Sequence, residues 1–274
     1  DYKLSTLWKN SLQRRRNTRG IRTLFLFEFF YYLLLLFLHI LAIPFLIFKS
    51  RQSKYKEAIP ARFFLKNNAS FKTDSLWFHS CSMGETKAIK PLIKYFLEKD
   101  IDVNMSVATN TGYEEALKTT NEVRYLPFET LLPFWQGKQK VLVVMEAELW
   151  LMLFYIAKLK KTKTILINAR ISDSSYESYK KFSFLYKRIF RNIDKVFAQS
   201  QIDKKRLISL GAKNVEVIGN IKLWAKPELK LNLQKPKEEI ITAASTHENE
   251  EELILNSYEK SYGKLVVVPR HPER

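Results

Sequence analysis

A polar run from Ser82 to Thr86 (SMGET) carries the side chain best suited to acid–base chemistry. It lies between a segment with strand character and one with helical spacing, which places Glu85 at the start of a helix, where the helix dipole favours an ionised carboxylate. An ionised, positioned glutamate can take a proton from a hydroxyl group, and Gly84 allows an unusual backbone turn and the close approach of a ligand. We therefore expect Glu85 unprotonated at the mouth of a crevice; the alternative is that it only caps the helix.

Three other polar clusters follow segments with strand character. Glu146 and Glu148 in MEAELW would share one face if their strand continued, and paired carboxylates divide acid and base roles or bind a metal. The alternative for this pair is a solvated loop that orders neighbouring lysines. Arg170 in NARISD can fork onto a phosphate or a carboxylate. The third cluster, ATNTGYE, contains Thr109 and Thr111.

A last cluster, Ser245-Thr246-His247-Glu248, follows a strand-like segment and opens a helix. Hydroxyl and backbone N–H groups at that position form a seat for an anion, and His247, Arg270 and His271 can surround a nucleotide phosphate. Neither GxGxxG nor GxxxxGK[ST] occurs, so the sequence supports neither a dinucleotide fingerprint nor a P-loop. The histidines lack metal-ligand spacing and the chain has one cysteine, so we expect no bound metal.

These clusters are positioned by alternating strands and helices. Strands are predicted at 75–79, 101–108, 141–145, 164–168, 194–199 and 214–218, and helices at 87–99 and 112–120. A basic-aromatic helix is predicted at 179–191; it packs on the core or lies against an anionic lipid. The alternation predicts an α/β fold with a parallel sheet covered on both faces, whose function gathers at the carboxyl ends of the strands.

An apolar run at 23–49 is long enough to cross a bilayer. It is preceded by a basic, aperiodic segment, 1–22, that we interpret as a flexible leader. The run contains Glu28 and His39, which are unusual in lipid. The sequence leaves open whether this anchor helix spans the membrane or is monotopic, and basic residues flank it on both sides, so the positive-inside rule does not orient it.

The formal net charge of +18 implies an anionic partner. Beside a membrane anchor, anionic lipid or a phosphorylated substrate is favoured over nucleic acid, for which no recognised motif appears. Segment 50–222 is predicted to form one α/β domain with this sheet. Segment 223–238, which has two prolines and no clean period, is predicted to be a linker. Segment 239–274 contains one βαβ unit, which buries too little to be an ordinary domain, so we expect a truncated second domain.

Taken in order, seven segments of the chain resemble the 3-deoxy-D-manno-octulosonic acid (Kdo) transferases of Gram-negative bacteria. They are WFHSCSMGET, VATNTGYEEA, MEAELW, NARISDSSYESY, GNIKLW, ASTHENEEE and VPRHPER. The resemblance implies a B-type glycosyltransferase fold: an N-terminal Rossmann-like domain for the lipid acceptor and a C-terminal one for the nucleotide-sugar donor. It implies an inverting transfer of Kdo from CMP-Kdo to lipid IVA, without a bound metal or other cofactor, in lipopolysaccharide biosynthesis at the cytoplasmic face of the inner membrane.

The resemblance also implies roles for single residues. The family's base is the Glu of its Ser-x-Gly-Glu motif, which falls on Glu85. Acceptor-binding positions are expected at Ser82, Gly84, Thr109, Thr111, Glu146, Glu148 and Arg170, and donor-binding positions at Ser245, Thr246, His247, Arg270 and His271. In the family, further strands and a glycine-rich acidic segment follow PRHPER, and the anchor normally begins without a leader such as 1–22.

Two alternatives stay open beside a Kdo transferase. One is a different membrane-associated glycosyltransferase that uses another sugar nucleotide. The other is a catalytically inactive, membrane-bound, lipid-binding fragment. The first would transfer a sugar from a donor other than CMP-Kdo, and the second would bind lipid but transfer no sugar.

Overall fold

The computed structural model describes the backbone of residues 2–224, 234 and 236–271, and side chains from Leu26 onward within these ranges. The chain divides into two compact units, Asp1–Lys226 and Pro227–Arg274, and each is described by itself. The predicted linker, 223–238, lies largely outside the described residues.

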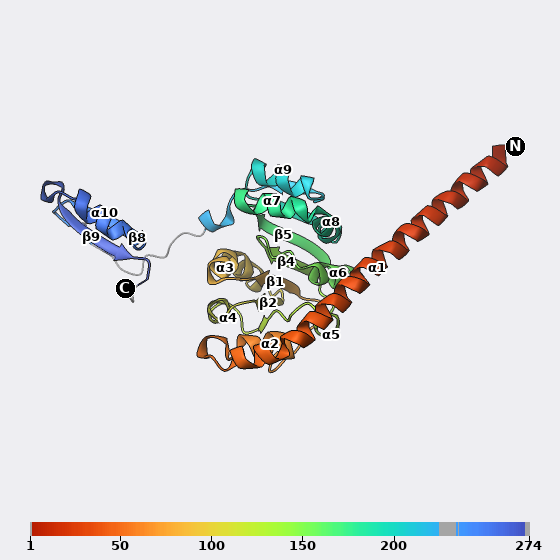
Figure 1. Cartoon of the computed structure of the whole chain (residues 1–274), viewed down its shortest axis with the longest axis horizontal. Coiled ribbons are helices and arrows are strands. Elements are labelled where there is room, and N and C mark those ends of the chain that lie inside the picture. The colour runs from red at the N-terminus through yellow and green to blue at the C-terminus, as the bar shows by residue number, and fades with distance from the viewer. Residues whose placement is uncertain (1, 225–233, 235, 272–274) are drawn as a thin grey trace. The chain divides into compact units, whose positions relative to one another are not determined.

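The first unit is built on one parallel sheet (Figure 1). Its strand order is β3-β2-β1-β4-β5-β6-β7, and every neighbouring pair is parallel. The strands are β1 (Leu76–Ser80), β2 (Val103–Val107), β3 (Val123–Tyr125), β4 (Val141–Met145), β5 (Lys163–Ala169), β6 (Lys195–Ala198) and β7 (Val215–Val217). The predicted α/β class and parallel sheet are confirmed, and only the three-residue β3 was not anticipated.

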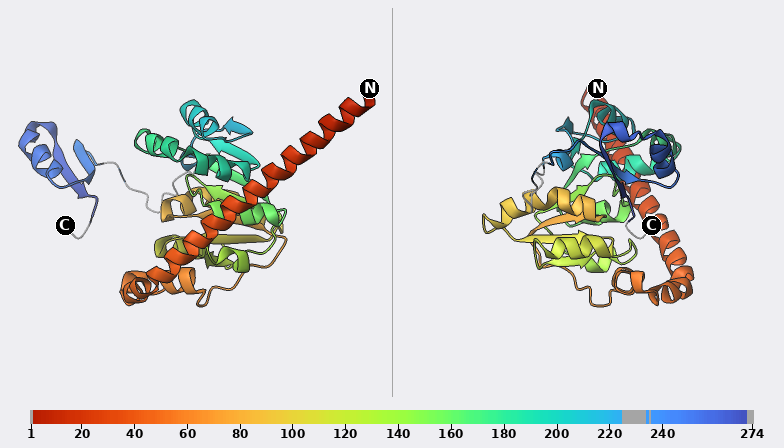
Figure 2. Two further views of the ribbon diagram at one scale, coloured as in Figure 1. Left: turned by 45° about the vertical axis from the view of Figure 1, so that its right-hand side comes forward. Right: turned by 90° about the vertical axis from the view of Figure 1, so that its left-hand side faces the viewer.

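Helices cover both faces of this sheet, as the two views of Figure 2 show. They are α2 (Ala58–Phe64), α3 (Met83–Leu97), α4 (Asn110–Leu117), α5 (Leu132–Trp135), α6 (Leu151–Leu159), α7 (Asp173–Lys181), α8 (Ser183–Arg191) and α9 (Gln201–Ser209), with 3-10 turns η1 (Ser53–Tyr55) and η2 (Ile221–Leu223). Successive strand residues enter opposite cores: Trp77 packs with α6 and α8, and Phe78 with α3 and α4. The single helix predicted at 179–191 is wrong, because the chain leaves helical geometry at Phe182 between α7 and α8.

The order of the strands creates one special position. From β1 the chain moves outward to β2 and β3 and then returns to β4 on the other side of β1. In open parallel sheets the connections leave in opposite directions at such a switch point, and ligands bind in the crevice at the carboxyl ends of the two strands. The segments that follow β1 and β4 hold Glu85, in the first turn of α3, and Glu146 and Glu148.

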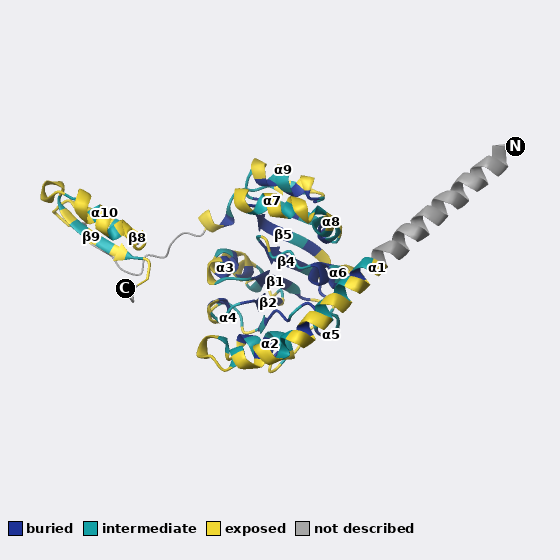
Figure 3. Cartoon of the chain, viewed as in Figure 1, coloured by how far each residue is buried: buried dark blue, intermediate teal, exposed yellow. Residues whose placement is uncertain are grey.

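The helix α1 runs from Tyr2 to Ser50 without interruption. The backbone of 2–22 belongs to this helix, and the interpretation of 1–22 as a flexible leader stays a prediction. The part Leu26–Ser50 is long and apolar enough to cross a membrane. Much of its surface is exposed, and buried positions recur along one stripe (Figure 3).

The second unit contains a parallel pair, β8 (Ile240–Thr246) and β9 (Lys264–Pro269), with α10 (Glu250–Ser257) and a 3-10 turn, η3 (Lys260–Tyr262). Thr246 was predicted to open a helix; instead it ends β8, and α10 begins at Glu250. Several apolar side chains of the two strands are exposed, namely Ile240, Ile241, Val266 and Val268.

Candidate active site at the switch point

Glu85 lies in the first turn of α3, which follows β1. Ser82 is the N-cap: its Oγ accepts a hydrogen bond from the Glu85 N–H at 3.3 Å. In return, Glu85 Oε1 accepts from the Ser82 hydroxyl at 2.9 Å, and Oε2 accepts from the Cys81 N–H at 2.8 Å. This reciprocal arrangement is a variant of the capping box, so the capping role considered for Glu85 is realised.

The environment of Glu85 differs from the one expected. The residue is only 8% exposed, and burial raises the pKa of its carboxyl. The Cys81 N–H and Ser82 hydroxyl lower that pKa in part, whereas the charges of Glu146 and Glu148 raise it further. The expectation of an open carboxylate at the mouth of a crevice is therefore wrong for this conformation, because the side chain is buried, and desolvation outweighs the favourable hydrogen bonds in the pKa of its carboxyl.

The pKa of the Glu148 carboxyl is shifted in the opposite direction, downward. Burial works to raise the pKa of its carboxyl, but neighbouring donors prevail and lower it. The His79 Nε2 lies 3.9 Å from Glu148 Oε2, which also accepts a hydrogen bond from the Trp150 indole at 2.7 Å. The switch point thus holds a buried carboxylate, Glu85, and a half-buried one, Glu148, whose environments push their pKa values apart, as in sites where two carboxylates divide acid and base roles.

His79 and Cys81 were not predicted as site residues. His79 is fully buried on β1, where its Nδ1 lies 2.9 Å from the Ser106 hydroxyl. Burial raises the pKa of the Cys81 thiol to about 12, with the Glu148 and Glu85 charges acting in the same direction. His79 stands two residues before Cys81 in a buried strand, and its sequence context resembles an ordinary core position.

The β2–α4 loop packs directly against the loop of Glu85. Thr109 Oγ1 donates a hydrogen bond to the Cys81 carbonyl at 2.8 Å and accepts one from the Gly112 N–H at 3.2 Å. A Cβ on Gly112 would lie 3.2 Å from the same carbonyl, a tight contact, so the close approach favours glycine there. The predicted acceptor position Thr109 is thereby brought against the loop that precedes Glu85, and Thr111 lies in the adjoining first turn of α4.

A cavity of about 650 Å³ opens beside this loop. Thr109 and Thr111 line it, together with three cations and an apolar wall; the full lining includes Phe45, Leu46, Lys49, Lys54, Tyr55, Ile59, Arg62 and Phe63. Arg62, which sequence reasoning missed, donates to the carbonyls of Leu126 and Ala108 at 3.0 and 3.2 Å. Glu85 is not among the lining residues.

Glu146 does not share a strand face with Glu148. β4 ends at Met145, and Glu146 takes a left-handed backbone conformation (φ 53°) that turns the chain. Its Oε1 forms an ion pair with Lys222 Nζ at 2.5 Å and accepts a hydrogen bond from Asn168 Nδ2 at 3.2 Å. Glu146 therefore joins the ends of β4 and β5 to η2.

Arg170 and Gly84 are both exposed at this edge. Among the described residues, Arg170 forms no ion pair, so its guanidinium is available to an anion. Gly84 is helical and has no positive φ, so the predicted unusual turn is wrong. A Cβ there would meet only Ser82 Oγ, at 4.0 Å, which leaves open space beside the helix start.

The predicted donor residues of the second unit also gather at one edge. Thr246 Oγ1 donates to Glu251 at 2.6 Å, the His247 N–H donates to Glu250 at 2.7 Å, and Arg270 Nη1 lies 3.1 Å from His247 Nε2. Ser245 has a left-handed backbone (φ 65°), and His271 follows the end of β9. Within the described parts of both units, no group of three or more His, Cys, Asp or Glu side chains is arranged to hold a metal ion.

The family model of 3-deoxy-D-manno-octulosonic-acid transferase matches residues 57–225. This chain belongs to the Kdo transferase family. The matched range contains Arg62, His79, Glu85, Glu148 and Arg170, that is, the whole switch-point site. The residues of the second unit lie beyond it.

Similar proteins agree with this assignment. A bifunctional glycosyltransferase/methyltransferase of Fusobacterium nucleatum is 35% identical over 73% of this chain and 34% of its own length. The 3-deoxy-D-manno-octulosonic acid transferase of Haemophilus influenzae is 31% identical over 91% of this chain and 64% of its own length. That of Chlamydia pneumoniae is 28% identical over 79% and 52%. This Kdo transferase family chain therefore spans between about a third and two thirds of the length of these relatives.

A solved structure, the S. aureus MnaA–UDP co-structure, superposes with a TM-score of 0.48 at 16% identity, covering 73% of this chain and 64% of that one. A score this low carries no argument about function.

Proposed function

We propose that this Kdo transferase family chain takes part in moving Kdo from CMP-Kdo to a hydroxyl of lipid IVA in lipopolysaccharide biosynthesis, with Glu85 as general base. The observation that supports this most is the pair of carboxylates at the β1–β4 switch point, Glu85 buried and Glu148 half-buried, with opposed pKa shifts. A base with a raised pKa is the stronger proton acceptor once it is ionised, and efficient bases have a pKa nearer the working pH than an ordinary glutamate.

Glu85 already makes the kind of contact that the proposed proton transfer needs. Glu85 Oε1 already accepts a hydrogen bond from an alcohol, the Ser82 hydroxyl, at 2.9 Å. In the proposed reaction the acceptor hydroxyl replaces Ser82 as donor and gives its proton to Glu85. The freed oxygen bonds to the anomeric carbon of Kdo from the face opposite CMP, the bond to the CMP phosphate breaks, and CMP leaves with that electron pair, which inverts the anomeric centre.

The cavity beside the Glu85 loop supports a phosphorylated lipid acceptor. Lipid IVA carries acyl chains and two phosphates. The apolar wall that includes Phe45 and Phe63 suits the former, and the cations Lys49, Lys54 and Arg62 suit the latter. We place the binding site for the CMP phosphate at the edge of the second unit that carries Thr246, His247 and Arg270. The proposed location is the cytoplasmic face of the inner membrane.

A transfer assay separates this function from its alternatives. The protein is supplied with radiolabelled lipid IVA and either CMP-Kdo or other sugar nucleotides. Product from CMP-Kdo supports the proposal. Transfer only from a different sugar nucleotide favours another glycosyltransferase of the membrane. Retained binding of lipid IVA without transfer from any donor favours a catalytically inactive lipid-binding protein.

A further inference from the structure

The helix α1 is held against its own domain along most of its apolar length. Its buried and half-buried positions repeat every three or four residues, at Glu28, Tyr31, Tyr32, Leu35, His39 and Leu46. This stripe covers about 27 Å of helix at about 1.5 Å per residue. A helix that crossed a bilayer alone would have lipid around its whole circumference over such a length.

Specific polar contacts fix this docking. The Tyr31 hydroxyl donates to Glu129 Oε1 at 2.8 Å, and His39 Nδ1 lies 2.6 Å from the Thr130 hydroxyl. Glu129 is itself buried, and its other oxygen accepts a hydrogen bond from the Met152 N–H at 2.7 Å, at the start of α6. The docked face is therefore part of the folded domain. Glu28 and His39, which are costly in lipid, both lie on this protected face.

Charged groups border the docked face. The Arg188 guanidinium of α8 lies 4.0 Å from the ring centre of Phe27. The hydrocarbon core of a bilayer is about 30 Å thick, nearly the length of the stripe. If α1 crossed it, the loop with Glu129 and the basic helix α8 would be drawn into hydrocarbon beside it, where charges are expensive.

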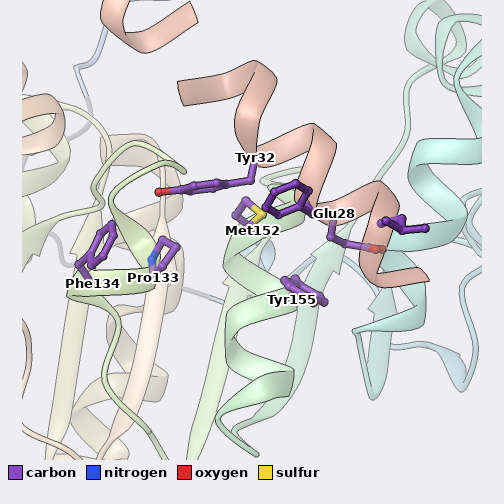
Figure 4. A pocket seen from close by; sticks show the side chains of 8 residues that line it. Glu28, Tyr32, Pro133, Phe134, Met152 and Tyr155 are labelled. Carbon is purple, nitrogen blue, oxygen red and sulfur yellow. The ribbon is translucent and has the colours of Figure 1, made fainter. Parts of the chain in front are cut away.

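The face of α1 that is not packed against the domain is exposed and apolar. Large apolar side chains are exposed along its length, at Leu26, Phe29, Phe30, Leu33, Leu34, Phe37, Leu38, Leu41, Phe45 and Phe48. The domain continues this surface with Phe134, which is 79% exposed, and Phe64. A cavity of about 680 Å³, which Phe134 helps to line, has walls from α1, α5 and α6 (Figure 4). Lys49 and Lys54 at the end of the helix suit anionic headgroups.

We propose that α1 lies in the plane of the membrane interface, with one face on its domain and the other among the acyl chains of anionic lipids, and does not cross the bilayer. Both ends of the apolar run then stay on the same side of the membrane as the domain. This inference rests on the packing of α1 and is independent of the sugar chemistry.

Cysteine accessibility in membranes of bacterial cells tests this directly. The native Cys81 is replaced by serine, and Thr23→Cys or Ser50→Cys is introduced at either end of the run. A membrane-impermeant maleimide is then applied to intact spheroplasts and to inverted inner-membrane vesicles. We expect both cysteines to react in the same preparation and neither in the other. Reaction of one in spheroplasts and of the other in inverted vesicles would overturn the proposal.

A depth measurement gives a second, independent readout. Environment-sensitive dyes on Phe30→Cys and Phe48→Cys, both on the exposed face, are quenched by lipids spin-labelled at shallow or deep acyl positions. An in-plane helix places Phe30, Phe37 and Phe48 at equal depth, so a Phe37→Cys dye should show the same shallow-to-deep quenching ratio within about twofold. A helix that spans the bilayer would bury the Phe37→Cys dye deepest and leave the other two near the interfaces.

Discussion

Replacing Glu85 by glutamine separates the two roles that the structure gives this side chain. As a cap, Glu85 accepts hydrogen bonds from the Cys81 N–H and the Ser82 hydroxyl. As a base, it must accept a proton. A glutamine amide keeps the shape: its carbonyl oxygen can accept from Cys81, and its NH₂ group can donate to Ser82 Oγ, which also has acceptor capacity. It cannot act as a base at any accessible pH.

The magnitudes follow from these contacts. Because Glu85→Gln retains both hydrogen bonds and removes a buried charge, we expect the free energy of unfolding to change by no more than about 1 kcal/mol. Glu85→Ala loses both bonds and should cost about 1–3 kcal/mol. If Glu85 is the general base, its loss lowers turnover by about 10²- to 10⁴-fold in either variant. The two substitutions thus agree in activity and differ in stability.

The assay measures turnover with saturating CMP-Kdo and lipid IVA, lipid IVA binding, and urea unfolding of each variant. Glu98→Gln, an exposed change at the other end of α3, is the matched control and should leave all three unchanged. Turnover of Glu85→Gln within about fivefold of the wild type would refute the base role. It would leave Glu85 as a structural cap, which is the reading that its burial by itself favours.

Further predictions concern pH and neighbouring positions. Because burial raises the pKa of Glu85, activity should fall on acidification at a pH above 4.5, the ordinary pKa of a glutamate, as a pH–rate profile will show; an acid limb below that pH contradicts it. Burial also raises the pKa of Glu129, so its contribution to stability is full below pH 4.5 and is lost as pH rises through the folded-state pKa. Glu129→Gln should therefore gain stability relative to wild type toward neutral pH in urea unfolding. Gly84→Ala should unfold no more easily than wild type, since helices favour alanine by about 1 kcal/mol, yet raise KM if a ligand occupies the open space there; an unchanged KM excludes that contact. Arg170→Ala should raise KM for a phosphorylated substrate by about tenfold or more, with the loss of a charge-assisted hydrogen bond, and leave stability unchanged.

Glu85 at the switch point shows which features of the site could be predicted from the sequence and which could not. The motif around Glu85 predicted a carboxylate at a helix start, and this is where it lies. Its burial was not predicted, because burial depends on what packs above the loop. That cover comes from Thr109 and Gly112, more than twenty residues away, and from the loop after β4.

The amino-acid sequence by itself determined every strand of the first sheet except β3, the helix of the apolar run and the family. Runs such as VLVVM are apolar because both faces of a parallel strand are covered, and this pattern is local. Only the tertiary structure decided the strand order that places Glu85 beside Glu148, the burial of His79, and the docked stripe of α1. These features depend on contacts between residues distant in the chain, such as Tyr31 with Glu129, and a one-dimensional pattern of hydropathy carries no information about which distant surfaces meet.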